Sequence, residues 1–144
     1  KVKETEKKKE KHIYIGYAKE DEEATMKLYH NLQKSGINVW LDTINISPGE
    51  HWKMSVYKAI SQSKYFIAIL SENSISKKGY FQKELKTAIE ISEKYPPTDI
   101  FIIPVRLEEC EPLHKEISDI YQVDMFPSWE NGVERIIETI KTNS

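Results

Sequence analysis

Short apolar runs alternate along the chain with stretches in which apolar residues recur every third or fourth position. The apolar runs predict five β-strands, at residues 12–15, 37–41, 64–70, 99–105 and 117–123. The run at 64–70 is apolar almost throughout, which is typical of a central strand in a parallel sheet covered on both faces. Pro104 cannot donate a hydrogen bond, so we expect it near the end of its strand or where strand pairing lapses.

The periodic stretches predict four helices. The first opens at residues 19–23, whose acidic side chains complement the helix dipole, and it ends at Ser35 and Gly36, where glycine supplies a left-handed cap. The second runs from about Trp52 to Ser61. The apolar faces of the other two contain Phe81, Leu85, Ala88 and Ile89, then Trp129, Val133, Ile136, Ile137 and Ile140. Polar segments at 43–50, 71–78 and 107–115 are expected to be loops.

Strands that alternate with helices predict an α/β fold with a parallel sheet and helices on both of its faces. Five strands fit the flavodoxin-like order 2-1-3-4-5. We expect one folded domain at residues 12–144. Residues 1–11 consist almost entirely of Lys and Glu, and we interpret them as a charged linker or disordered leader from an upstream sensor or oligomerisation domain.

Composition narrows the class of protein. The chain has 144 residues, 39% of them hydrophobic and 31% charged, as in an ordinary globular domain. Its net charge of −2 gives no general attraction to nucleic acid. The single cysteine, Cys110, excludes an internal disulfide and fits a reducing compartment. No apolar run approaches the roughly 20 residues that a membrane span needs, and no secretory signal opens the chain, so a cytoplasmic location is expected.

Several kinds of active site find no support in the sequence. The chain has no Gly-x-Gly-x-x-Gly motif after its first strand and no Gly-x-x-x-x-Gly-Lys loop, the two glycine-rich motifs that bind phosphate groups. The four histidines have no metal-ligand spacing with each other or with Cys110, so no metal site is expected. Cys110 is a possible nucleophile, but no base is placed beside it. Asp21 resembles one acid of a receiver domain, but the other acids of such a pocket are missing at the ends of the first and third strands.

In such a sheet, ligands bind beyond the carboxyl ends of the strands, near the switch between strands 1 and 3. Tyr17, Asp42 and Ser71 stand at those ends, and Glu84 lies near the start of the helix after the third strand. We therefore expect these side chains to converge. Trp52 is either a core anchor of its helix or a stacking surface beside the cleft, and the spacing favours the core.

Glu84 lies at the border of the apolar face of its helix, with Tyr80 one turn before it. One interpretation is a carboxylate that faces a cleft and stays solvated enough to ionise. The other is an ordinary surface glutamate paired with Lys83 or Lys86. Helical position by itself favours the second, because charged residues on helices are usually solvated.

A family resemblance changes that balance. The matching segments are IYIGYAKED (13–21), GINVWLD (36–42), SPGEHW (47–52), SQSKYFIAILS (61–71), KEL (83–85) and IPV (103–105). In this order, and over residues 12–141, they resemble the Toll/interleukin-1 receptor (TIR) domain family, especially its prokaryotic members. The resemblance implies the strand order above and a self-association loop at Ser47, Pro48 and Gly49.

The resemblance also implies an activity. Many TIR domains cleave NAD+ at the nicotinamide–ribose bond, giving ADP-ribose or a cyclic isomer, after oligomerisation in defence or cell-death signalling. Glu84 matches their catalytic glutamate, and Tyr80 stands where that family usually has tryptophan. Tyr17, Asp42 and Trp52 match pocket positions. NAD+ is then the substrate, with no cofactor and no metal. The alternative is a non-catalytic adaptor that binds other TIR domains.

Overall fold

The computed structural model describes residues 11–76 and 79–143, so the expected leader lies, apart from Lys11, outside the described residues. A five-stranded parallel sheet runs in the order β2-β1-β3-β4-β5, which confirms the predicted topology. The strands are β1 (Ile13–Gly16), β2 (Val39–Trp40), β3 (Tyr65–Leu70), β4 (Ile102–Arg106) and β5 (Val123–Asp124).

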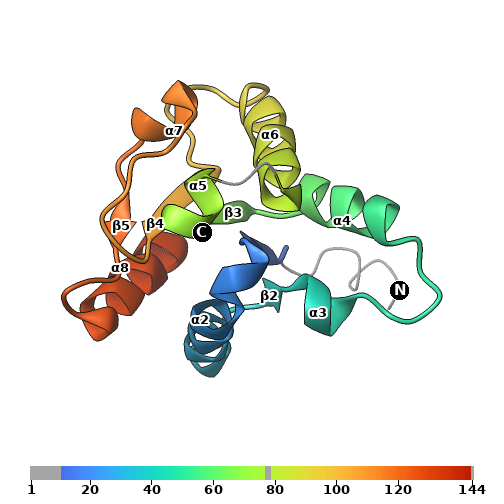
Figure 1. Cartoon of the computed structure of the whole chain (residues 1–144), viewed down its shortest axis with the longest axis horizontal. Helices are drawn as coiled ribbons and strands as arrows, with labels where there is room; N and C mark the ends of the chain where they lie inside the picture. The colour runs from blue at the N-terminus through green and yellow to red at the C-terminus, as the bar shows by residue number, and fades with distance from the viewer. Residues whose placement is uncertain (1–10, 77–78, 144) are drawn as a thin grey trace.

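Helices cover both faces of this sheet (Figure 1). One face is covered by α2 (Glu22–Lys34) and α8 (Trp129–Thr142), and the other by α4 (Trp52–Ser61) and α6 (Tyr80–Ser92). The remaining helical segments are short: η1 (Lys19–Asp21), α3 (Asp42–Asn45), α5 (Glu72–Ser76) and α7 (Lys115–Ser118). Gly36 ends the first long helix with φ +83, as its position after Ser35 predicted.

Strand β3 divides the hydrophobic core into two layers. All six of its residues are buried, and successive side chains point to opposite faces. Ile67 and Ile69 join the layer under α2 and α8, whereas Phe66, Ala68 and Leu70 join the layer under α4 and α6. The prediction of a central strand from an unbroken apolar run is therefore confirmed.

Pro104 sits in the middle of β4, beside Ala68 of β3. The backbone of Arg106 accepts a hydrogen bond from Met125 on the β5 side, so Pro104, two residues earlier, also turns its nitrogen toward that side. Pairing with β5 begins only at Val105. The nitrogen of Pro104, which cannot donate a hydrogen bond, thus faces β5 at a position where the two strands are not yet paired. This confirms the expectation that Pro104 lies where strand pairing lapses.

Several predicted boundaries are wrong. Only Val123 of the predicted strand 117–123 belongs to β5, and the buried Ile117 lies in α7 instead. Between them the chain is exposed, with Tyr121 82% accessible, so no alternating buried face exists there. The segments expected as loops at 43–50 and 71–78 contain the short helices α3 and α5.

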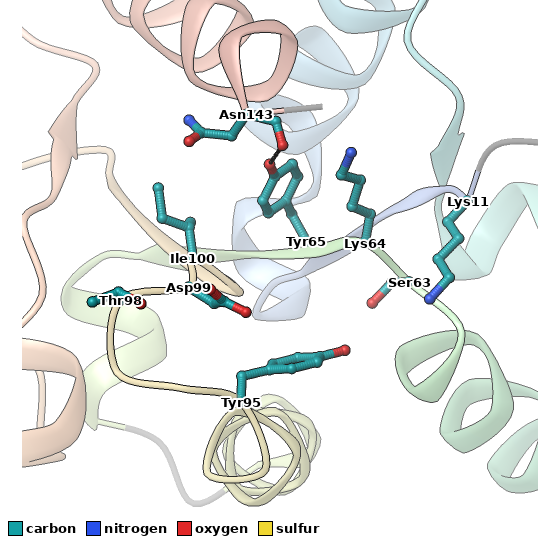
Figure 2. A pocket seen from close by; sticks show the side chains of 9 residues that line it. All are labelled: Lys11, Ser63, Lys64, Tyr65, Tyr95, Thr98, Asp99, Ile100 and Asn143. Atoms are coloured by element: carbon teal, nitrogen blue, oxygen red, sulfur yellow. Dashed lines mark hydrogen bonds between the residues drawn. The ribbon is translucent and has the colours of Figure 1, made fainter.

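A cleft of about 360 Å³ lies at the amino ends of β3 and β4 (Figure 2). It is walled by Tyr95 on one side and by Lys64 and Tyr65 on another, and the Tyr65 hydroxyl donates a hydrogen bond to the backbone oxygen of Asn143 at 3.0 Å. This is the edge of the sheet opposite to the one at which ligands bind in such folds.

Candidate active site

Glu84 projects from the second turn of α6 toward the sheet. It is only 5% exposed, and its Oε2 accepts a short hydrogen bond from the hydroxyl of Tyr14 in β1. Lys83 and Lys86 are exposed, and no ion pair to Glu84 is found within residues 11–76 and 79–143. The carboxylate is thus neither partly solvated nor paired with a neighbouring lysine, and both expectations for its surroundings are wrong. The reason is Tyr14, which supplies a partner from inside the sheet.

The ring of Tyr14 is held between two other rings on the same face of the sheet. Trp40 of β2 and Phe66 of β3 are its cross-strand partners. Their ring centroids lie 5.1 and 5.2 Å away, with interplanar angles of 14° and 10°. Each strand therefore fixes one ring of a three-ring stack, and the hydroxyl that meets Glu84 is placed by the rigid centre of the sheet.

Burial decides the charge of Glu84. Loss of water raises the pKa of Glu84 to about 8, the hydrogen bond from Tyr14 works against this rise, and the negative charge of Asp42 adds to it. Burial and the nearby Glu84 carboxylate also raise the pKa of Tyr14, so that this residue remains a hydroxyl donor. At neutral pH the carboxyl group of the resting domain is therefore mostly protonated.

Asp42 links the site to the end of β1. It begins α3 instead of closing the second strand, and its Oδ1 accepts hydrogen bonds from the Tyr17 hydroxyl at 2.9 Å and from the Thr43 backbone at 2.7 Å. Burial, followed by the charge of Asp42, raises the pKa of Tyr17. The same charge raises the pKa values of Glu84 and Tyr80, so Asp42 lies within electrostatic range of both.

Trp52 and Tyr80 meet at the starts of α4 and α6. Their ring centroids are 4.7 Å apart at an interplanar angle of 61°, an edge-to-face contact. Trp52 is 47% exposed, so its interpretation as a core anchor is wrong. Val56 and Ile60, one and two turns later, are buried instead. Tyr80 is partly buried, and burial together with Glu84 raises the pKa of Tyr80 to about 12.

The structure brings the five predicted pocket residues, Tyr17, Asp42, Trp52, Tyr80 and Glu84, into one chain of contacts and electrostatic interactions. It adds Tyr14, which sequence reasoning missed. A signal was present: Tyr14 is the one hydroxyl-bearing residue inside the apolar run of β1, and a buried tyrosine hydroxyl needs a partner. Ser71, also expected at this edge, is buried but bonds elsewhere.

Ser71 belongs to a separate polar cluster around Asp21. The Asp21 carboxylate accepts hydrogen bonds from Ser71 Oγ at 2.5 Å and from Asn73 Nδ2 at 3.1 Å. These bonds connect η1 to the segment after β3 and use both oxygens of Asp21. Asp21 is only 7% exposed. It is therefore an internal brace, and the receiver-like interpretation of this acid finds no support.

Cys110 is buried, and burial raises its pKa to about 11, so the group is a thiol at neutral pH. It has the opposite of the lowered pKa that a nucleophilic cysteine requires. Among the described residues, no group of three or more His, Cys, Asp or Glu side chains is arranged to hold a metal ion. No helix within the described part of the chain is long and apolar enough to cross a membrane.

The predicted self-association loop is an exposed turn between α3 and α4. The backbone nitrogen of Glu50 donates to the oxygen of Ser47 at 3.1 Å, with Pro48 and Gly49 as the central residues. Gly49 has φ +96. Proline followed by a glycine in this conformation is the pattern of a type II turn, and all three predicted loop residues are exposed.

Comparison with known proteins adds to this geometry. The family model described as "TIR domain" matches residues 13–137. NAD(+) hydrolase PdTIR of Paracoccus denitrificans is 35% identical over 74 residues, which are 51% of this chain and 24% of that protein. NAD(+) hydrolase TcpA of Theionarchaea archaeon is 28% identical, over 89% of this chain and 38% of that protein. 2′ cyclic ADP-D-ribose synthase AbTIR of Acinetobacter baumannii is 25% identical, over 77% of this chain and 45% of that protein.

The chain thus spans less than half the length of each of these relatives. Among solved structures, the TIR domains of the activated Roq1 resistosome align with a TM-score of 0.76 at 16% identity, covering 91% of this chain and 99% of theirs. The heterodimer of the RPS4 and RRS1 TIR domains aligns with a TM-score of 0.61 at 19% identity, covering 93% and 98%. At these identities the structural matches bear on the fold alone.

Proposed function

The chain belongs to the TIR domain family, and from that premise we propose that it cleaves NAD+ at the nicotinamide–ribose bond, with Glu84 as the catalytic residue. The observation that carries this proposal is the Glu84 carboxyl group itself. It is buried, its pKa is raised to about 8, and it lies in a cluster with two aromatic rings and a second carboxylate. Strongly perturbed carboxyl groups of this kind are concentrated at active sites.

The relatives that support this proposal bear the names of NAD+ hydrolases and a cyclic ADP-ribose synthase. In the cleavage step, the bond between ribose C1′ and the ring nitrogen breaks, and nicotinamide leaves as a neutral molecule with the electron pair. C1′ becomes oxocarbenium-like. Water then adds and releases a proton to give ADP-ribose, or a hydroxyl group of the same molecule adds to give a cyclic isomer.

One carboxylate suffices for this chemistry. Most glycosidases need a second carboxyl group to protonate the leaving group. Nicotinamide leaves a cationic pyridinium without protonation, so the task left to the protein is to stabilise positive charge at C1′. An ionised Glu84 in a water-poor site does this electrostatically. The cationic ring of NAD+ itself favours the ionised form, because an opposite charge nearby lowers the pKa of a carboxyl group.

The other pocket residues have roles that follow from their chemistry. Trp52 is exposed and presents an aromatic surface on which a planar ring can stack, with Tyr80 supporting its edge. Asp42, held by Tyr17, offers an acceptor for ribose hydroxyl groups. Glu84 is covered in the described conformation, so productive binding requires the residues around it to move apart.

Self-association is the proposed means of that opening. The exposed turn at Ser47, Pro48 and Gly49 joins α3, which begins with Asp42, to α4, which begins with Trp52. A neighbouring copy bound to this turn pulls on two walls of the pocket at once. Assembled TIR domains appear among the structural matches, as a resistosome and as a heterodimer. We place the proposed activity in defence or cell-death signalling, as the family resemblance implies.

Nicotinamide release from NAD+ tests the activity. The chain is clustered on beads at high density, so that neighbouring copies meet, and wild type is compared with Glu84→Ala. Loss of a group that stabilises transition-state charge is expected to slow release by about 100-fold or more. Glu90→Gln, which changes an exposed glutamate of the same helix, is the control and keeps the wild-type rate. Equal rates for wild type and Glu84→Ala would remove Glu84 from the mechanism.

The second candidate function is a non-catalytic adaptor that binds other TIR domains. The burial of Glu84 against Tyr14 favours it, because a covered carboxyl group has no access to substrate in the described conformation. An adaptor releases no nicotinamide even when clustered. Its self-association survives Glu84→Ala and is lost in Pro48→Asp, which places a charge on the exposed turn. Self-association that persists in Pro48→Asp contradicts the role of this turn in either function.

A further inference from the structure

The hydroxyl of Tyr14 in β1 donates a hydrogen bond to the carboxyl group of Glu84 in α6. Within residues 11–76 and 79–143, no other group donates a hydrogen bond to Glu84. Tyr14 is 1% exposed and Glu84 is 5% exposed, so water has little access to either partner. The contact joins positions 70 residues apart in the sequence.

We propose that Tyr14 is the positioning residue of Glu84: its hydroxyl fixes the carboxyl group in one place and favours the ionised form that the reaction uses. The inference rests on the proposed function for its catalytic meaning. The contact itself and its effect on the charge of Glu84 hold whether or not the domain turns over NAD+, and the test below separates the two.

The groups that face Glu84 leave Tyr14 alone in this role. From α3, Asp42 contributes a negative charge that favours the neutral carboxyl group. From α6, Tyr80 contributes a hydroxyl that remains protonated at neutral pH, since its pKa is raised to about 12. Trp40 and Phe66 stack on the ring of Tyr14 and bring no charge to the site. Among the described residues no cation forms an ion pair with Glu84 or lowers its pKa, and its neighbours Lys83 and Lys86 are exposed.

The variant Tyr14→Phe isolates the hydroxyl. It keeps the ring between Trp40 and Phe66 and removes only the donor to Oε2. Glu84 then lacks the one interaction that opposes burial, so its pKa is expected to rise above the wild-type value of about 8. Loss of a hydrogen bond to a charged group corresponds to a rise of about one pH unit or more.

A matched control exists at the other edge of the sheet. Tyr65 is 2% exposed, and its hydroxyl also makes one hydrogen bond, to the backbone oxygen of Asn143 (Figure 2). Tyr65→Phe therefore removes a hydrogen-bonded tyrosine hydroxyl of the sheet without touching Glu84. A change seen in Tyr14→Phe and absent from Tyr65→Phe is specific to the contact with Glu84, and is not a general result of losing a tyrosine hydroxyl from the sheet.

The pKa of Glu84 is measured directly by ¹³C NMR of glutamate side-chain carboxyl groups, with the Glu84 signal assigned by its absence in Glu84→Gln. The expected result is a higher pKa in Tyr14→Phe and the wild-type pKa in Tyr65→Phe. In wild type, the Cζ signal of Tyr14 is expected to shift with the same pKa as Glu84, a readout that needs no variant to fold. An unchanged pKa in folded Tyr14→Phe, or a Tyr14 signal that ignores the Glu84 titration, would overturn the proposal.

Turnover by the clustered protein gives the catalytic half of the test. In Tyr14→Phe, kcat at pH 7 is expected to fall about tenfold or more, with a smaller change in KM, and the rise of kcat with pH moves to higher pH. A fall that is equal at all pH values contradicts the effect on charge. If clustered wild type releases no nicotinamide, the proposed function fails, and if Glu84→Gln turns over NAD+ as fast as wild type, the catalytic role of Glu84 fails. In both cases the NMR result for Tyr14 stands on its own.

Discussion

Replacing Glu84 by Gln should make the fold more stable in alkaline solution, and the size of the effect follows from the burial of this one side chain. Gln has nearly the same shape, cannot ionise, and still accepts the Tyr14 hydrogen bond through its amide oxygen. The substitution therefore removes the burial of an ionisable group and little else. At low pH, where wild-type Glu84 is neutral, both proteins are expected to unfold at similar denaturant concentrations.

The sign and magnitude come from the two pKa values. Glu84 has its usual pKa of 4.5 when unfolded and a pKa of about 8 in the fold, so the folded protein holds a proton that the unfolded chain releases. The stabilisation from this proton is complete below pH 4.5 and is lost as the pH rises to 8. The interval of about 8 − 4.5 = 3.5 pH units, at 1.36 kcal/mol each, gives at most about 5 kcal/mol. Total stabilities of domains are only about 5–15 kcal/mol.

Urea unfolding followed by circular dichroism at a series of pH values from 4 to 9 measures this difference. The free energy of unfolding of Glu84→Gln minus that of wild type should grow steadily above pH 4.5 and level off above pH 8. Glu90→Gln, an exposed site on the same helix, should track wild type. If the Glu84→Gln and wild-type curves run parallel across this range, Glu84 ionises as easily in the fold as in the unfolded chain, and the argument from burial is wrong.

Three further predictions concern other parts of the domain. Asp124→Asn breaks the ion pair in which Asp124 accepts two hydrogen bonds from the buried Arg106, at 2.7 and 2.9 Å. Urea unfolding should show that this variant loses about 2 kcal/mol of stability at pH 7. The loss should be smaller near pH 3, because Arg106 lowers the pKa of Asp124, and the stabilisation that the wild-type pair provides disappears as the pH falls below the ordinary pKa of an aspartate. Gly16→Ala places a Cβ 2.6 Å from the Phe66 ring, which should reduce the free energy of unfolding by about 1–3 kcal/mol and should be seen as a lower melting temperature. Cys110 should react with a thiol reagent at pH 7 only after urea unfolding, because it is buried and its pKa is raised to about 11; rapid labelling of the native protein would contradict this.

The fold was predictable because its main signals are local. The apolar run of β3 and the helical spacing of Leu85 and Ala88 on α6 can be read within a few residues of each other. Strand β5 has no such signal. It contains only Val123 and Asp124, and it becomes a strand because β4 offers it an edge, so its extent depends on a neighbour 18 residues away.

The candidate site was predictable only in part. Family segments pointed to Asp42, Trp52 and Glu84 as its members, but the surroundings of these residues depend on how α4 and α6 lie against the sheet. Trp52 shares the helical spacing of Val56 and Ile60, yet it begins the helix and stays 47% exposed. The partner of Glu84 could not be deduced from spacing, because the contact with Tyr14 depends on the register of β1 and on the rotation of α6.

The burial of Glu84 keeps its carboxyl group mostly neutral, and the positive charge of the proposed substrate is strong enough to ionise it. With a pKa of about 8, roughly a tenth of the carboxyl groups are ionised at pH 7. Lowering that pKa by about two pH units makes the ionised form dominant and requires about 3 kcal/mol. A positive charge about 5 Å away supplies about 3 kcal/mol at the effective dielectric constant of a protein site. The proposed substrate carries a positive charge on its nicotinamide ring, and this charge disappears when the bond to ribose breaks. The proposed substrate therefore brings a charge that favours the ionised form of Glu84, and an analogue whose nicotinamide ring is uncharged, such as NADH, should bind without this effect.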